Sequence, residues 1–252
     1  MRTMMRRGLL AGAIALALTP AAAQEPTAVD LELLLLADAS GSIDDAEIRF
    51  QRRGYVDALR DPGLVRAMTA GFHGRVALAY VEWGTVGSQD MVAGWRVIDG
   101  EASAEAFAQA LLAAPRRAQG RNAIGDALMF ATAEIETNAF AGRRKVIDFS
   151  ADSANNWGGP SIAEGRAAAL AADIVINGLA VLCRACSGRP VSYDLEAAFR
   201  DQLIGGPGAF VVTADSRETF GAAVRSKLFL EVSGAAPPAP SRLAAHADVT
   251  SP

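Results

Sequence analysis

Three oxygen-bearing side chains follow one short apolar run near the start of the chain. Asp38, Ser40 and Ser42 stand at alternate positions directly after the leucines of residues 33–36. Gly41 lets the backbone between them fold back tightly, so that the carboxylate and the two hydroxyls converge on one point. Oxygen ligands with a negative charge suit a hard divalent cation such as Mg²⁺. The spacing therefore predicts a metal site immediately after a buried strand.

A second carboxylate belongs to the same predicted site although it is distant in sequence. Asp152 follows the apolar run at residues 146–149. Parallel strands joined by right-handed crossovers end at the same edge of a sheet, so we expect Asp152 beside Asp38, as a direct ligand or through water. A purely structural interpretation competes with this one. In it, Asp38 and Ser40 cap the following helix, and Asp152 fixes a turn.

The elements that must position these residues alternate between apolar runs and helical stretches, which is typical of a parallel sheet with helices on both faces. We predict a three-layer α/β/α fold with a doubly wound, mostly parallel sheet and one antiparallel edge strand. The predicted strands span residues 31–37, 75–82, 89–98 (the edge strand), 145–150, 174–181 and 209–212. The predicted helices span residues 45–59, 103–113, 122–136, 161–172, 192–202 and 216–230.

Residues 1–23 have the pattern of an export signal. Three arginines precede an apolar stretch at residues 8–18, and Ala21–Ala23 offers the small residues that signal peptidase accepts. A retained membrane anchor is the alternative, although the apolar stretch is short for a bilayer span. Cleavage before Gln24 would remove three positive charges and no acid, lowering the net charge from −4 to −7. We therefore expect a periplasmic or secreted protein without affinity for anionic membranes after cleavage.

Composition indicates one large α/β domain. The chain has 252 residues, of which 51% are hydrophobic and 21% charged, as in ordinary soluble proteins. No concentrated basic segment suggests nucleic-acid binding. We place the domain at residues 30–233 and interpret the Ala/Pro-rich residues 234–252 as a disordered tail.

The Asp-x-Ser-x-Ser pattern after a buried strand resembles the first metal-site loop of von Willebrand factor type A domains. Within that group, the chain resembles an exported bacterial family of unknown function (DUF1194-like). The matching stretches are residues 38–42, 54–62, 79–83, 120–128, 146–156, 176–179 and 204–210.

The resemblance implies a metal-ion-dependent adhesion-type site made of three loops. It adds Asn122 to the ligands, at a position where type A domains normally have a threonine hydroxyl. An amide oxygen is still a hard ligand, but its longer side chain changes the geometry that Mg²⁺ requires, so Mn²⁺ and Ca²⁺ are alternatives to Mg²⁺. The resemblance also implies an open coordination position that an acidic side chain of a protein or peptide partner fills. The expected activity is binding, and we do not expect an enzyme.

Trp157 is the residue that we expect on the rim of this site, in contact with the partner. The alternative is that Trp157 packs against its own loop. Two other functions compete with metal-dependent binding. One is a periplasmic hydrolase that activates water at the same metal, which the lack of a nearby histidine and of a Gly-x-Ser-x-Gly motif disfavours. The other is a metal-free interaction scaffold with a degenerate site, which Asn122 favours.

Cys183 and Cys186 are the only two cysteines of the chain. In an exported protein, such a pair favours a local disulfide. A thioredoxin-like redox pair is less favoured because that motif normally begins a helix early in its fold, whereas this pair follows a late strand. A structural zinc site needs four ligands, and the sequence has no second pair.

Overall fold

The structure is a computed structural model that describes residues 25–41, 43–182 and 193–235. Predictions on the export signal, Ser42, Cys183, Cys186 and the tail beyond residue 235 therefore lie outside the described residues. The strands are β1 (Thr27–Val29), β2 (Leu31–Asp38), β3 (Val76–Trp83), β4 (Gln89–Ile98), β5 (Phe140–Gly142), β6 (Lys145–Ala151), β7 (Val175–Val181) and β8 (Val211–Ala214). The helices are α1 (Asp45–Leu59), α2 (Pro62–Met68), α3 (Glu101–Ala113), α4 (Ile124–Thr137), α5 (Ile162–Ala171), α7 (Leu195–Ala198), the π-helix η1 (Phe199–Leu203) and α8 (Arg217–Ser233).

The main sheet has the strand order β4-β3-β2-β6-β7-β8. All neighbouring pairs are parallel except β3 and β4, so β4 is the antiparallel edge strand. This arrangement confirms the predicted doubly wound, mostly parallel sheet. The chain runs from β2 outward to β3 on one side and later returns to β6 on the other side. The topological switch point, where open sheets bind ligands, therefore lies at the carboxyl end of β2.

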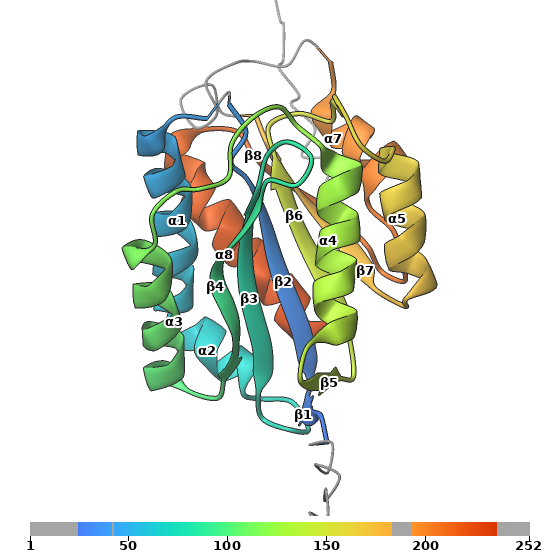
Figure 1. Ribbon diagram of the computed structural model, residues 1–252. Coiled ribbons are helices and arrows are strands. Elements are labelled where there is room, and N and C mark those ends of the chain that lie inside the picture. Colours follow the sequence, from blue (N-terminus) through green and yellow to red (C-terminus); the bar gives the residue numbers. More distant parts are fainter. Residues whose placement is uncertain (1–24, 42, 183–192, 236–252) are drawn as a thin grey trace, which may run out of the picture.

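The helices cover both faces of the sheet (Figure 1). Helices α1, α2, α3 and α8 pack on one face, and α4, α5 and α7 with η1 pack on the other. The central strand β2 is buried over its whole length and supplies leucines to both layers. A strand buried on both faces reads as a continuous apolar run, which is why residues 31–37 were recognisable from sequence.

Several elements differ from the sequence prediction. Asp61 does end α1, but it also accepts hydrogen bonds from Gly63 and Leu64 and so starts the helix α2, which was not predicted. The short parallel pair of β1 and β5 was also missed, since three-residue strands leave no periodicity. The helix predicted at residues 192–202 is shorter and ends as the π-helix η1. The last strand lies at 211–214 and not at 209–212, because a turn with left-handed glycines at 206 and 208 precedes it.

Aromatic residues in the strands pack into the core. Tyr80, Trp83 and Phe149 are fully buried, and the rings of Trp83 and Phe149 stack 5.2 Å apart. Trp95 is partly buried against the same cluster. Within the part of the chain that the structure describes, no helix combines the length and apolarity that crossing a membrane requires.

Candidate metal site

The sheet register brings the two predicted carboxylates together. β2 and β6 are adjacent parallel strands, and Ala37 of β2 stands opposite Ser150 of β6. Asp38 and Asp152 therefore leave the sheet at neighbouring positions of its carboxyl edge. Both side chains are buried, with 1% of Asp38 and 5% of Asp152 exposed. The predicted convergence of these two residues thus agrees with the geometry.

The first loop is folded around the Asp38 carboxylate. Asp38 Oδ1 accepts a hydrogen bond of 2.7 Å from the backbone N–H of Ser40, and the Ser40 side chain also bonds this carboxylate. The structural interpretation in which Asp38 or Ser40 caps the following helix is wrong. Asp44 is the N-cap of α1, and its carboxylate accepts from the backbone N–H groups of Ala46 and Glu47. Asp38 and Ser40 therefore do not cap α1, and both can serve as ligands of the candidate metal site.

The second loop is tied to the first through its backbone. The Gly41 N–H donates to the Gly120 carbonyl over 2.7 Å. Gly120 has a φ of 89°, a left-handed conformation that favours glycine, and a Cβ there would meet the side chain of Thr85. This link places Asn122 beside Asp38, with Asn122 Nδ2 donating to Asp38 Oδ2 over 3.3 Å.

The electrostatics of the site show two carboxyl groups that repel each other. Burial raises the pKa of Asp38 to about 6, although hydrogen bonds with Ser40, Asp152 and Asn122 act in the opposite direction. Burial and the neighbouring Asp38 charge raise the pKa of Asp152 to about 8. Without a cation, one proton between the two carboxyl groups relieves the repulsion. A divalent cation in the same place would relieve it more fully.

These residues fit a hard divalent cation by their chemistry. The buried set contains two carboxylates, a hydroxyl and an amide, all of which offer oxygen. Among the residues that the structure describes, no three histidine, cysteine, aspartate or glutamate side chains gather in a metal-binding arrangement. The site therefore depends on Ser40 and Asn122 as well as on its carboxylates. Ligation by Asn122 needs its amide turned over, so that the oxygen and not the nitrogen faces Asp38.

Residues that the sequence analysis missed hold the site in place. Arg116 donates to the carbonyl oxygens of Ala39 and Ser40, over 2.8 and 3.2 Å, and forms an ion pair with Asp45. It therefore fixes the first loop to the start of α1. Gln51 is also buried and lines a small depression with Asp38 and Asp152. A single arginine or glutamine carries no spacing signal, so neither was recognisable from sequence.

Trp157 lies beside the second loop. Its backbone N–H donates to the Asn122 carbonyl over 2.8 Å, so the tryptophan is held next to a candidate ligand. The side chain is 59% exposed, and the guanidinium of Arg121 stands over its ring, 4.5 Å from the centroid. Trp157 thus both packs on a neighbouring loop and presents an aromatic face to solvent.

One family model matches most of the chain. The family described as "Protein of unknown function (DUF1194)" matches residues 28–236, which is most of the chain. The chain belongs to the DUF1194 family. A search of curated proteins gives no significant match for this DUF1194 protein.

Solved structures similar to this DUF1194 protein share its fold. They include proximal thread matrix protein 1 (PTMP1) from the mussel byssus, with a zinc-occupied MIDAS motif, at 14% identity and a TM-score of 0.58 over 83% of this chain and 50% of that chain. They also include a von Willebrand factor type A protein from Catenulispora acidiphila, at 14% identity and a TM-score of 0.53 over 81% and 43%. The PilB minor pilin from Streptococcus sanguinis gives 13% identity and a TM-score of 0.56 over 86% and 63%.

These likenesses establish the fold as von Willebrand factor A-like, and the family resemblance inferred from sequence is confirmed. The chain spans between 43% and 63% of the length of these three structures. At this level of identity the likeness concerns the fold, and what each whole protein binds is a property of that protein.

Proposed function

We propose that this DUF1194 protein is an exported, divalent-cation-dependent module that binds a protein or peptide and catalyses no reaction. The observation that carries the proposal is the convergence of Asp38 and Asp152, both buried, at the topological switch point of the sheet. Two repelling carboxylates in a buried place are unfavourable unless a cation or a proton compensates them. A binding site that needs a cation explains why the chain keeps both.

Asp38, Ser40, Asn122 and Asp152 would hold the cation, together with Ser42 if it lies where the sequence pattern predicts. The cation would supply a positive centre at the surface that accepts one further oxygen ligand. Mg²⁺ is our first choice because the set contains only oxygen donors, with Mn²⁺ and Ca²⁺ next. Zinc belongs in the same series of trials, because PTMP1 was solved with zinc in its MIDAS motif.

The partner that fits such a centre is a protein or peptide with an accessible Asp or Glu side chain. A carboxylate gains most from a cation in a place shielded from water, and an amide gains less. Trp157 and Arg121 lie next to Asn122 and offer an aromatic face and a positive charge for the surroundings of that carboxylate. Similarity to a minor pilin supports an extracellular or periplasmic setting.

Hydrolysis is less well supported than binding as the function of this site. His73, the one histidine inside the described ranges, lies in the turn before β3, which is the opposite end of that strand from the site. A hydrolase would then need one of the ligand carboxylates as its general base.

The test is the thermal unfolding of residues 24–252 in EDTA and after addition of Mg²⁺, Mn²⁺, Ca²⁺ or Zn²⁺. An ion that binds only the folded state stabilises it by about 2.7 kcal/mol at a hundredfold excess over its Kd. We expect this rise in the wild type and in Asp57→Ala, which removes an exposed carboxylate of α1. We expect no rise in Asp38→Ala. A wild type that responds to no ion would instead support the metal-free scaffold.

The partner class is tested by selecting peptides from a random displayed library in the presence of the stabilising ion and eluting them with EDTA. The selected peptides should be enriched in Asp and Glu and should not bind Asp38→Ala. Peptides that lack acidic residues, or that bind the variant equally well, would contradict the proposed partner. Ion-dependent turnover of simple esters would point to the hydrolase.

A further inference from the structure

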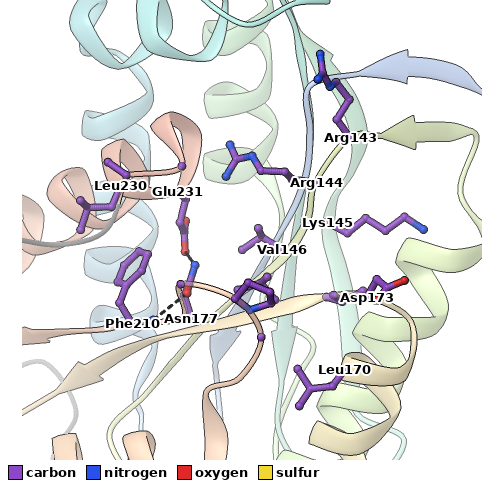
Figure 2. A pocket seen from close by; sticks show the side chains of 17 residues that line it. Arg143, Arg144, Lys145, Val146, Leu170, Asp173, Asn177, Phe210, Leu230 and Glu231 are labelled. Atoms are coloured by element: carbon purple, nitrogen blue, oxygen red, sulfur yellow. Dashed lines mark hydrogen bonds between the residues drawn. The ribbon is translucent and has the colours of Figure 1, made fainter.

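A second cavity lies at the other end of the sheet from the candidate metal site. It has a volume of about 420 Å³ and opens between the amino ends of β6 and β7, the turn before β8 and the last turn of α8 (Figure 2). Much of its wall is apolar. The apolar side chains are those of Val146, Leu170, Ile174, Val175, Phe210 and Leu230. The size and lining suit a small molecule with an apolar body.

A buried carboxyl group at this cavity has one oxygen without a partner. Glu231 is 2% exposed, and its Oε1 accepts from Lys227 Nζ over 2.5 Å and from Asn177 Nδ2 over 3.3 Å. Its Oε2 has no hydrogen-bond partner among the described residues. Lys227 also forms an ion pair of 2.7 Å with Asp148, so the lysine charge is shared between two acids. Both oxygens of Asp148 also lack a hydrogen-bond donor, and a hydrogen bond between Glu231 and Asp148 accounts for the proton that the two acids share.

A half-buried guanidinium faces the same space. Arg144 points toward Leu230 and Glu231, whereas Arg143 extends away from the cavity (Figure 2). Arg144 makes one hydrogen bond within the described ranges, from Nη2 to the Val232 carbonyl over 2.9 Å. Burial lowers its pKa, although Glu231 and Asp30 act in the opposite direction. Its remaining N–H groups are therefore available to an anionic ligand.

We propose that this cavity binds a small organic carboxylate with an apolar body, whose charged end lies at Arg144. Arg143 and Lys145 also belong to the lining, but Arg143 extends away from the cavity, so the attraction for an anion comes mainly from Arg144. The site is separate from the metal-binding edge, and the proposal does not depend on the function proposed above.

The protonation of Glu231 supports a carboxylate over an amine. Burial and the nearby Asp148 raise the pKa of Glu231 to about 8, so the group is mostly neutral at pH 7. Because Oε1 already accepts two hydrogen bonds, the proton belongs on Oε2. The neutral group hydrogen-bonds Asp148 and adds no negative charge beside the ligand, and Arg144 supplies the charge opposite to that of the carboxylate.

The test is an NMR titration of ¹⁵N-labelled protein at pH 7 with benzoate, phenylacetate and hexanoate, and with benzamide and benzylamine as neutral and cationic counterparts. We expect at least one carboxylate to shift the amide signals of Val146, Val175, Gly206 and Gly208 with saturation, and to bind at least tenfold more tightly than the amide or the amine. Absence of saturable shifts with all three carboxylates would overturn the proposal. Tighter binding of benzylamine would overturn it too.

Three variants test where the carboxylate group of the ligand binds. Arg144→Gln should weaken the carboxylate at least tenfold, because a charge-assisted hydrogen bond is lost. Arg143→Gln removes the same charge from the neighbouring position, where the guanidinium stands over the Phe72 ring, and should change the affinity less than twofold. Glu231→Gln keeps the side chain neutral and should retain the carboxylate within about threefold.

Equal weakening by Arg143→Gln and Arg144→Gln would contradict the proposed place of the carboxylate. Loss of binding in Glu231→Gln would contradict the neutral state of Glu231 in the complex. If Arg144→Gln melts far below the wild type, Arg144→Lys replaces it. The lysine keeps the charge but lacks the planar donor pair, and it should still weaken binding at least threefold.

Discussion

At the scale of single residues, the candidate metal site brings together two carboxyl groups that repel each other when both are ionised. Both side chains are buried, which raises the pKa of each, and the charge of Asp38 raises the pKa of Asp152 further. Residues chosen for stability alone would not place two acids in this way. Repulsion between buried carboxylates at the carboxyl edge of a sheet is typical of a cation site without its cation.

This repulsion predicts that one substitution raises the stability of the metal-free protein but weakens its stabilisation by the ion. In EDTA at pH 8, Asp152→Asn should raise the free energy of unfolding by about 1 kcal/mol, because an amide hydrogen-bonds Asp38 without adding charge. The same variant should lose most of the stabilisation that the ion gives the wild type. Urea unfolding with and without the ion measures both effects. Asp57→Asn, on the exposed side of α1, should change neither, and a less stable Asp152→Asn protein in EDTA would argue against the repulsion.

At the scale of elements, the loop that carries Asn122 is positioned by the packing of α4 on α5. Gly125 lies in the first turn of α4, and a Cβ there would lie 2.2 Å from the Pro160 carbonyl oxygen and 2.3 Å from that of Ser161. A Cβ at Gly165 of α5 would lie 2.6 Å from the Gly125 carbonyl oxygen. The two glycines let the backbones approach, and this approach also fixes the Trp157 loop, which precedes α5.

We therefore expect Gly125→Ala to destabilise the protein by about 2 kcal/mol or more, since the contact is with backbone that must move. The displacement would reach Asn122, so the variant should also respond less to the stabilising ion. Gly221→Ala is the matched control, because a Cβ at this position of α8 meets nothing within 4 Å. It should stabilise the protein by about 0.5–1 kcal/mol. Chemical denaturation of both variants tests the contrast.

At the scale of the whole molecule, a buried polar cluster holds the last helix to the sheet. Lys227 and Glu231 of α8 meet Asp148 of β6 and Asn177 of β7, and all four are almost completely buried. The cluster has two acids for one lysine. The charges of the cluster therefore balance only when one acid is protonated. Burial and the charge of Asp148 raise the pKa of Glu231, so the proton is on Glu231.

The cluster predicts that stability falls as the pH rises. The pKa of Glu231 is about 8 in the folded protein and near its ordinary 4.5 when unfolded, so folding binds a proton between these values. Its stabilisation is complete below about pH 4.5 and is lost as the pH rises through 8. Arg144 and Lys227 reduce the loss, and Asp148 increases it.

Glu231→Gln should remove this dependence, because glutamine keeps the neutral form at every pH. Relative to this variant, the wild type should lose on the order of 2–4 kcal/mol of unfolding free energy between pH 5 and pH 9. Urea unfolding across this range, in EDTA for both proteins, gives the difference and cancels the shared contribution of Asp152. Parallel curves for the two proteins would show that Glu231 stays ionised throughout.

Much of the fold was predictable from sequence because its strands are buried on both faces and its helices have periodic apolar faces. Residues 31–37 and 146–149 read as strands for this reason, and their parallel pairing was enough to bring Asp38 and Asp152 to one edge. The antiparallel edge strand at 89–98 was recognisable by its higher polarity. Helix α2 and the strands β1 and β5 were missed, because such short elements depend on tertiary contacts more than on local pattern.

The sequence by itself determined the family, the architecture and the candidate ligands, because those follow from residue types at fixed spacing along strands and loops. Only the tertiary structure decided that Arg116 holds the first loop and that the buried Glu231 lies at a cavity beside Arg144. These facts depend on distances between residues far apart in the chain, whereas the cap that Asp44 provides for α1 is a contact within three residues. Burial and hydrogen bonding are properties of the packed molecule, and no single stretch of sequence contains them.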